Sequence, residues 1–93
     1  MINTDHPLRI AIAGLGFGES VHIPASLSNN NIELVGLWHH RKERLKEACN
    51  KHNLHAYDSW KDLVNDSKIN GIIIATPPAP RYELALEAIK AGK

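Results

Sequence analysis

Several features that mark large classes of proteins are scarce or missing in this chain of 93 residues. The single cysteine, Cys49, cannot form an internal disulfide, and it shares helical spacing with apolar neighbours, so we expect it to be a small buried hydrophobe. Eleven basic and ten acidic side chains leave a net charge of only +1. This balance gives no general attraction to nucleic acid or to an anionic membrane, so any anion-binding site must be local.

Long apolar runs are also missing. The longest, Ile10–Ala13 and Gly71–Ala75, fall far short of the ~20 residues that cross a bilayer, and Met1–Leu8 has no apolar region like that of a signal peptide. We therefore expect a cytoplasmic protein with neither a nucleic-acid nor a membrane partner. Hydrophobic residues at 43% and charged residues at 23% are ordinary for a globular protein, which predicts an ordered chain.

The motifs of several enzyme classes cannot be found. There is no P-loop lysine, no Ser-His-Asp order and no paired-carboxylate arrangement, so a hydrolase or a kinase has no support. Six histidines suggest a metal site, and His52 and His55 have the i,i+3 spacing of some sites. No Cys-x-x-Cys motif and no further ligand accompany them, so we expect no metal.

The chain does contain apolar runs that alternate with helical patterns. Strands are predicted at Leu8–Ala13, Ile32–Trp38, a brief piece at His55–Tyr57, and Gly71–Ala75. Helical spacing predicts helices over 19–27, 41–52, 59–65 and 82–91. Repeated βαβ units of this kind predict an α/β protein with a Rossmann-type parallel sheet and helices on both faces, incomplete, with about four strands and four helices.

Local signals refine these helices. Pro24 removes one backbone donor, so the first helix should be short or kinked. Ser59 with Asp62 three residues later resembles a capping box, and Gly92 stands where a left-handed C-cap belongs. On the last helix, one face gathers the apolar residues Tyr82, Ala85, Leu86 and Ile89, while Glu83, Glu87 and Lys90 face away.

A glycine-rich turn joins the first strand to the first helix. Gly14 permits a tight turn, Gly16 lets the backbone approach a diphosphate without an intervening Cβ, and a helix start at Gly18 offers free N–H groups to the anion. The backbone around Phe17 belongs to the same cradle. Glu19 stands where the full dinucleotide fingerprint has its third glycine, and the alternative is that these glycines only make a tight turn.

The end of the second strand bears on the choice of cofactor. An NAD-specific fold normally places an acid there for the ribose 2′-hydroxyl, but this chain has His39, His40, Arg41 and Lys42. Such a basic cluster would attract a 2′-phosphate, so we predict NADP as the cofactor, with NAD possible. The alternative is that Arg41 and Lys42 merely occupy an exposed helix start.

His22 has two interpretations. It shares a helical face with Val21 and Ala25, so it either packs beneath the glycine turn or lines the cofactor cleft. We favour packing.

With these pieces placed, nearly the whole chain resembles the N-terminal domain of the Gfo/Idh/MocA oxidoreductase family. The resemblance rests on RIAIAGLGFG, on the HIPA segment that begins at His22, and on IIIATPP followed by ELALEAIKAGK. It implies that the turn after the last strand, Ala75, Thr76, Pro77 and Pro78, contacts the cofactor. The family often has Asn and His at the places of Pro78 and Arg81, so this chain departs from the pattern there.

The resemblance also implies what the intact protein does. Such a protein transfers hydride between the nicotinamide and a sugar, cyclitol or similar polyol, using a lysine in a Glu-Lys-Pro segment that lies beyond Lys93. Residues 1–93 would then be only the N-terminal part of the dinucleotide-binding domain, without a substrate domain or a catalytic residue, and inactive alone. The alternative is a non-catalytic nucleotide-binding or sensor module.

An exposed sheet edge is a further expectation. Without a following strand, Ile72, Ile73 and Ile74 lie in an edge strand that can pair with another copy, so we expect a homo-oligomer.

Overall fold

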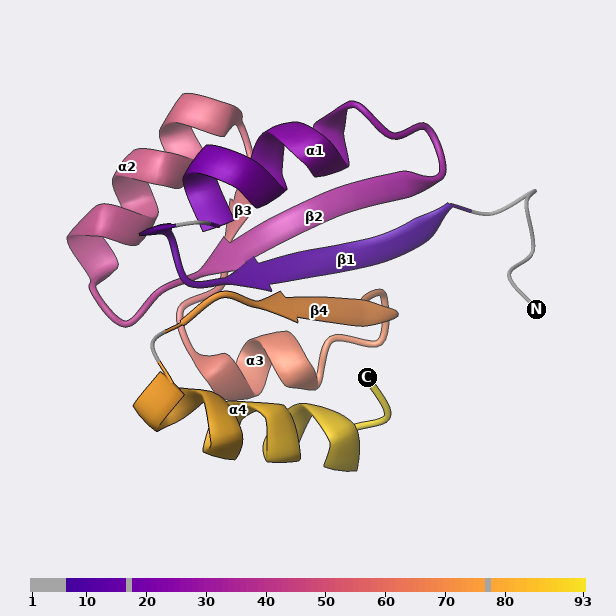
Figure 1. The fold of residues 1–93 in the computed structure, drawn as a ribbon, viewed down its shortest axis with the longest axis vertical. Coiled ribbons are helices and arrows are strands. Elements are labelled where there is room, and N and C mark those ends of the chain that lie inside the picture. Colours follow the sequence, from indigo (N-terminus) through magenta and orange to yellow (C-terminus); the bar gives the residue numbers. More distant parts are fainter. Residues whose placement is uncertain (1–6, 17, 77) are drawn as a thin grey trace.

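The structure of the protein is a computed structural model that describes residues 7–16, 18–76 and 78–93, with the backbone alone at residues 18, 78 and 79. Strands and helices alternate along it (Figure 1). The strands are β1 (Leu8–Ala13), β2 (Ile32–Trp38), β3 (His55–Ala56) and β4 (Gly71–Ile74). The helices are η1 (Gly18–His22), a π-helix, then α1 (Ile23–Leu27), α2 (Lys42–His52), α3 (Trp60–Val64) and α4 (Pro78–Lys90).

The strands form one parallel sheet in the order β3-β2-β1-β4. After β1 the chain crosses to β2 and β3 on one side, and it then returns to the other side of β1 to form β4. The strand order therefore reverses beside β1, and the carboxyl ends of β1, β2 and β4 lie together at one end of the sheet (Figure 1). These observations confirm the predicted Rossmann-type α/β fold.

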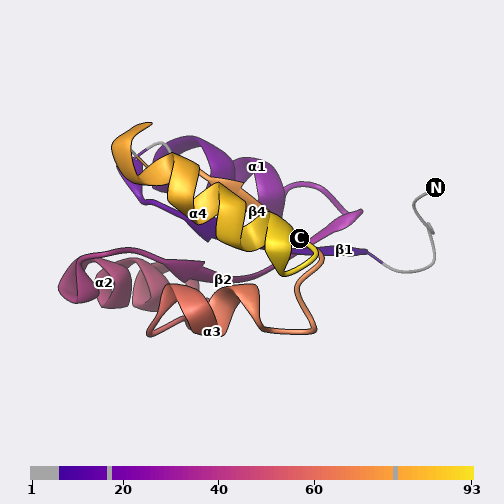
Figure 2. The same ribbon diagram turned by 90° about the horizontal axis from the view of Figure 1, so that it is seen from below.

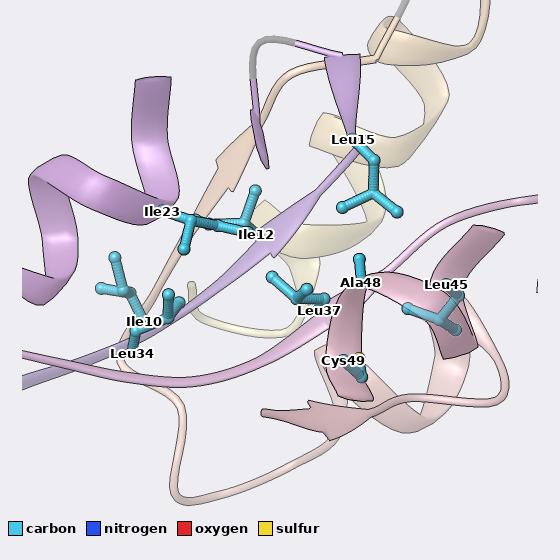
Figure 3. Packing of buried hydrophobic residues seen from close by; sticks show 9 residues of the cluster. All are labelled: Ile10, Ile12, Leu15, Ile23, Leu34, Leu37, Leu45, Ala48 and Cys49. Carbon is cyan, nitrogen blue, oxygen red and sulfur yellow. The ribbon is translucent and has the colours of Figure 1, made fainter. Parts of the chain in front are cut away.

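Helices cover both faces of the sheet. On one face α1 and α2 pack on Ile10 and Ile12 of β1, with Leu34 and Leu37 of β2 (Figure 3). On the other face α3 and α4 pack on Ala11 and other residues of the same strands, and Figure 2 shows these two helices in front of the sheet. Consecutive residues of β1 thus enter opposite cores, as the alternation of side chains along a strand requires.

A bulge in β2 interrupts this alternation. Ile10 pairs with Leu34 but Ala11 pairs with Gly36, so the register shifts by one residue at Val35. This shift is why Leu34 and Leu37 share a core although they are three positions apart, an odd spacing that would place them on opposite faces of a regular strand. A Cβ at Gly36 would lie 2.6 Å from the carbonyl oxygen of His55, so only glycine allows β3 to approach this closely.

The local signals in the sequence agree with the structure at three positions. The Ser59 hydroxyl accepts a hydrogen bond from the Asp62 N–H at 3.0 Å, which confirms the cap of α3. Gly92 has φ of 82°, which confirms the left-handed residue after α4. Cys49 is buried, and burial raises the pKa of its thiol, in keeping with the predicted small hydrophobe.

The first helix is interrupted, as Pro24 predicts. The segment winds as a π-helix through His22 and as an α-helix from Ile23. Because proline has no N–H, it cannot complete the bond that an α-helix would make to the residue four places before it.

Helix α4 contacts the sheet through a different face from the apolar one indicated by the sequence. Ala88 is buried and Leu84 and Ala91 are partly buried against the core, whereas Tyr82, Leu86 and Ile89 are exposed. Ala88 belongs to the same core cluster as Ala11 and Ala13 of β1, so the face of α4 that meets the sheet carries smaller side chains than the apolar face left exposed.

The end of α4 is tied to the loop before β4. The Lys93 ammonium donates to the carbonyl oxygens of Asp66 and Ile69, at 2.8 and 2.6 Å. Within the described ranges, no helix combines the length and apolar character needed to span a membrane.

Candidate functional site

A cleft of about 610 Å³ opens where the strand order reverses. The segments that follow β1, β2 and β4 form its wall, together with one residue each from η1 and α4. Its lining residues are Gly14, Leu15, Gly16, His22, Trp38, His39, His40, Ile74, Ala75, Thr76 and Arg81. Ligands of open parallel sheets bind at this position, beyond the carboxyl ends of the strands.

The glycine turn after β1 is locked to its neighbours by backbone contacts. Gly14 has φ of 97°, and its N–H donates to the carbonyl oxygen of Trp38 at 3.0 Å. A Cβ at Gly14 would lie 2.6 Å from the carbonyl oxygen of Ala75. Glycine is therefore required at position 14 both by conformation and by the close approach of the turn after β4.

Gly16 differs from Gly14 because neither the backbone conformation nor the packing of the described residues requires glycine at position 16. Its φ is not positive, and a Cβ built on it meets no atom within 4 Å. It lines the cleft, so a side chain at this position would occupy space next to the exposed backbone. A bare backbone facing an open cleft fits a ligand that approaches closely, as a diphosphate does.

The turn after β4 contains a buried hydroxyl group for which the described residues offer no hydrogen-bond partner. The Thr76 hydroxyl is buried and has no hydrogen-bond partner among the described residues, although buried polar groups are normally paired. Arg81 fixes this turn by donating to the Thr76 carbonyl oxygen from both Nε and Nη2, at 3.2 and 2.6 Å. Ala75 and Thr76, two of the residues predicted to contact the cofactor, line the cleft, whereas Pro77 lies outside the described residues.

Two histidines follow β2 and line the same cleft. The rings of His39 and His40 are stacked with centroids 4.4 Å apart, and His39 Nδ1 accepts the N–H of Arg41 at 3.1 Å. Burial, followed by the neighbouring His40, lowers the pKa of His39. Arg41 is exposed at the start of α2 and does not line the cleft, so the structure brings only the two histidines of the predicted cluster into it.

A smaller hollow of about 350 Å³ adjoins the cleft. It shares Trp38, His40 and Thr76 with the cleft, and Pro80 and Leu84 complete its wall. Because its lining is mostly apolar, this hollow could accept the flat face of an aromatic ring of a ligand.

The interpretation of His22 as a packing residue is wrong, because His22 is half-buried and lines the cleft. A π-helix has a wider turn than an α-helix, so α-helical spacing misplaces the residues within η1. Sequence reasoning also missed Trp38 and Arg81. The position of Trp38 at the carboxyl end of a predicted strand was a signal that could have found it.

Glu19, which replaces the third glycine of the fingerprint, joins η1 to α2. Its carboxylate accepts a hydrogen bond from the Arg44 guanidinium and lies 3.3 Å from His52 Nε2. The bond from Arg44 is the main reason why the pKa of Glu19 lies below its usual value. A carboxylate beside an anion cradle is thereby neutralised by a partner from the next helix.

The reversed strand order, the locked glycine turn and the cleft define a nucleotide-binding domain of the Rossmann type. The chain belongs to the oxidoreductase family with an NAD-binding Rossmann fold, the Gfo/Idh/MocA family, whose model matches residues 8–93. This membership confirms the resemblance in the sequence and makes the chain an NAD(P)-binding domain. Phe17 lies outside the described residues, and Gly18 begins η1.

Similar proteins are oxidoreductases. An uncharacterized oxidoreductase of Synechocystis is 32% identical over 92% of this chain and 24% of its own length. An inositol 2-dehydrogenase/D-chiro-inositol 3-dehydrogenase of Lactiplantibacillus plantarum is 26% identical over 95% of this chain and 26% of its own length. The chain thus spans about a quarter of the length of the curated relatives it matches.

Solved structures share the fold over the same range. An NAD-binding protein from Listeria innocua has a TM-score of 0.87 and 31% identity over 95% of this chain and 25% of its own. Biliverdin reductase from Synechocystis, in complex with biliverdin and NADP⁺, has a TM-score of 0.86 and 25% identity over 94% of this chain and 28% of its own.

Proposed function

We propose that this chain is the nucleotide-binding part of an oxidoreductase that uses NADP in preference to NAD and acts on a sugar, cyclitol or similar polyol. The observation that carries the proposal is Gly16, a glycine that neither its conformation nor its packing requires, at the wall of a cleft beyond the carboxyl ends of parallel strands.

The residues of the cleft divide into three groups. Backbone N–H groups of the turn between Gly14 and Glu19, among them those of Phe17 and Gly18, would hold the diphosphate, whereas the N–H groups of Gly14 and Glu19 themselves are bonded to the carbonyl oxygens of Trp38 and Leu15. His39 and His40 would face the adenosine ribose, while Arg41 lies outside the cleft, and Ala75, Thr76 and Pro77 would contact the cofactor from the other side. The bound nicotinamide supplies hydride transfer, and the chain supplies position and electrostatics.

The polyol substrate is supported by the inositol dehydrogenase of Lactiplantibacillus plantarum, which is similar over most of this chain. The biliverdin reductase of Synechocystis supports a different substrate class, since that structure is a complex with biliverdin and NADP⁺. The resemblance to the family implies that the catalytic lysine follows the segment that matches this chain. We therefore expect the 93-residue chain to bind dinucleotide without oxidising any alcohol.

Binding is tested by calorimetric titration of the chain with NADP and with NAD. We expect both to bind, NADP more tightly, with changes in the backbone NMR signals of residues 14–19. Gly16→Ala should weaken both dinucleotides by at least about tenfold, which corresponds to about 1.4 kcal/mol. Because nothing lies near the added methyl group, the variant should keep its thermal stability.

Gly71→Ala is the matched control. Gly71 also lacks a positive φ, and its added Cβ would make an ordinary 3.8 Å contact with Ile10, away from the cleft. This variant should bind as the parent chain does. If neither dinucleotide binds, or if Gly16→Ala binds as well as Gly71→Ala, the proposed site is wrong.

A further inference from the structure

The positive groups near the end of β2 differ in what they can offer a ligand. His39 and His40 line the cleft, whereas Arg41 is exposed and does not. Arg44, one turn further along α2, is held by Glu19. The permanent charges of the segment, on Arg41, Lys42 and Arg44, do not line the cleft. The ionisable groups of the segment that do line it are imidazoles, which change charge between about pH 5 and 8.

The two imidazoles have different roles. His39 accepts the N–H of Arg41 through Nδ1, so its neutral form carries the proton on Nε2 and can donate one hydrogen bond at any pH above neutrality. His40 is exposed and stacks on His39. Because two charged stacked rings would repel each other, a single positive charge on the pair is favoured, and the exposed ring of His40 lies at the wall of the cleft, open to a ligand.

One permanent charge does lie in the wall of the cleft, on Arg81 of α4, and His22 of η1 also lines it. The Arg81 guanidinium is held by the Thr76 carbonyl oxygen in the turn after β4, and β1 separates β4 from the strand that the two histidines follow. The positive charges of Arg41 and Arg44 disfavour protonation of His39. Among the described residues, no carboxylate lines the cleft that could favour a positive charge on the pair.

We propose that the His39–His40 pair selects between the two dinucleotides, recognising the 2′-phosphate of NADP with a protonated imidazole, so that the preference for NADP falls as pH rises. This inference rests on the proposed nucleotide binding. The 2′-phosphate is largely a dianion above about pH 6, so an imidazolium beside it forms a charge-assisted hydrogen bond that a neutral ring cannot match. NAD has no such phosphate, so the affinity for NAD should not depend on whether the histidine pair is protonated.

The test is the ratio of the Kd of NAD to that of NADP, measured by calorimetry on the 93-residue chain at pH 6, 7 and 8. We expect this ratio to fall by about tenfold between pH 6 and pH 8, as loss of one charge-assisted bond implies. His40→Gln should lower the ratio at pH 6 and leave it flat. His40→Arg should keep a high ratio that no longer depends on pH, because a guanidinium stays charged.

His55→Gln is the control, since His55 is exposed, packs edge-on against Tyr57 and does not line the cleft. It should retain the parent's pH dependence. If Arg41→Gln abolishes a preference that is independent of pH, Arg41 recognises the phosphate and the inference is overturned. If both dinucleotides bind with a constant ratio, the inference fails while nucleotide binding stands, and if neither binds at any pH, both fail.

Discussion

Helices α2 and α4 lie on opposite faces of the sheet and use their apolar residues in different ways. In α2 the apolar stripe of Leu45, Ala48 and Cys49 is buried in the core. In α4 the larger apolar residues stay outside, with Tyr82 74% and Ile89 67% exposed. Helical periodicity therefore identifies which residues share a face, but packing against the sheet decides which face is covered.

The sharpest test of this difference compares one leucine from each helix. Leu45→Ala should lower the free energy of unfolding by about 2–4 kcal/mol, because it leaves a cavity among buried side chains. Leu86→Ala makes the same chemical change at a residue that is 40% exposed, and its effect should stay below about 1 kcal/mol. Urea denaturation measures both, and equal losses would show that α4 packs on its apolar face.

A second, smaller difference concerns charge. Glu19 ties α2 to η1, whereas the Lys93 ammonium and two carbonyl oxygens tie the end of α4. The pKa of Glu19 is below its usual 4.5 in the folded chain. Its contribution to stability is thus fully present above the unfolded pKa and is lost as pH falls through the folded pKa.

Glu19→Gln should therefore reduce stability at pH 7 by less than Leu45→Ala does, and the difference from the parent chain should vanish in acid. Thermal melts at a series of pH values from 7 to about 2.5 measure it. The pKa of Asp66 is also lowered, chiefly by the hydroxyl of Tyr57. The parent chain and the Glu19→Gln variant therefore lose the stabilisation from the Asp66 charge equally in acid. A difference that persisted at the lowest pH would contradict the role of the Glu19 charge.

The smallest effect is expected on the exposed face of α4. Ile89→Lys should change the free energy of unfolding by no more than about 0.5 kcal/mol, since a side chain that is 67% exposed loses little contact with the core. Urea denaturation checks this value. A loss of several kcal/mol would mean that Ile89 is covered and that the two helices pack alike.

The sequence predicted the backbone features of this site better than its side chains. The glycine turn could be found because closely spaced glycines between a strand and a helix are typical of phosphate-binding turns, and the fold followed from the alternation of strands and helices. The contact of Arg81 with the Thr76 carbonyl oxygen joins two segments whose spacing carries no periodic signal. The bulge at Val35 and the close approach of β3 to Gly36 are contacts between strands, which one sequence does not encode locally.

His22 and α4 show a different reason for the mismatch. In both cases the residues were assigned correctly to a helix, but the side of the helix that meets the sheet was not. At His22 the π-helical winding changes the angle between successive residues. At α4 the face with the smaller side chains meets the sheet, and the area of the larger residues alone gives the wrong side.

The contact between Gly14 and Ala75 makes two distant parts of the chain interdependent. A methyl group at position 14 would meet the carbonyl carbon and oxygen of Ala75 at 2.7 and 2.6 Å, so the turns after β1 and β4 would have to separate. Any variant of this chain that keeps the two turns in contact therefore has to keep glycine at position 14, whereas the added Cβ at Gly16 meets no atom within 4 Å.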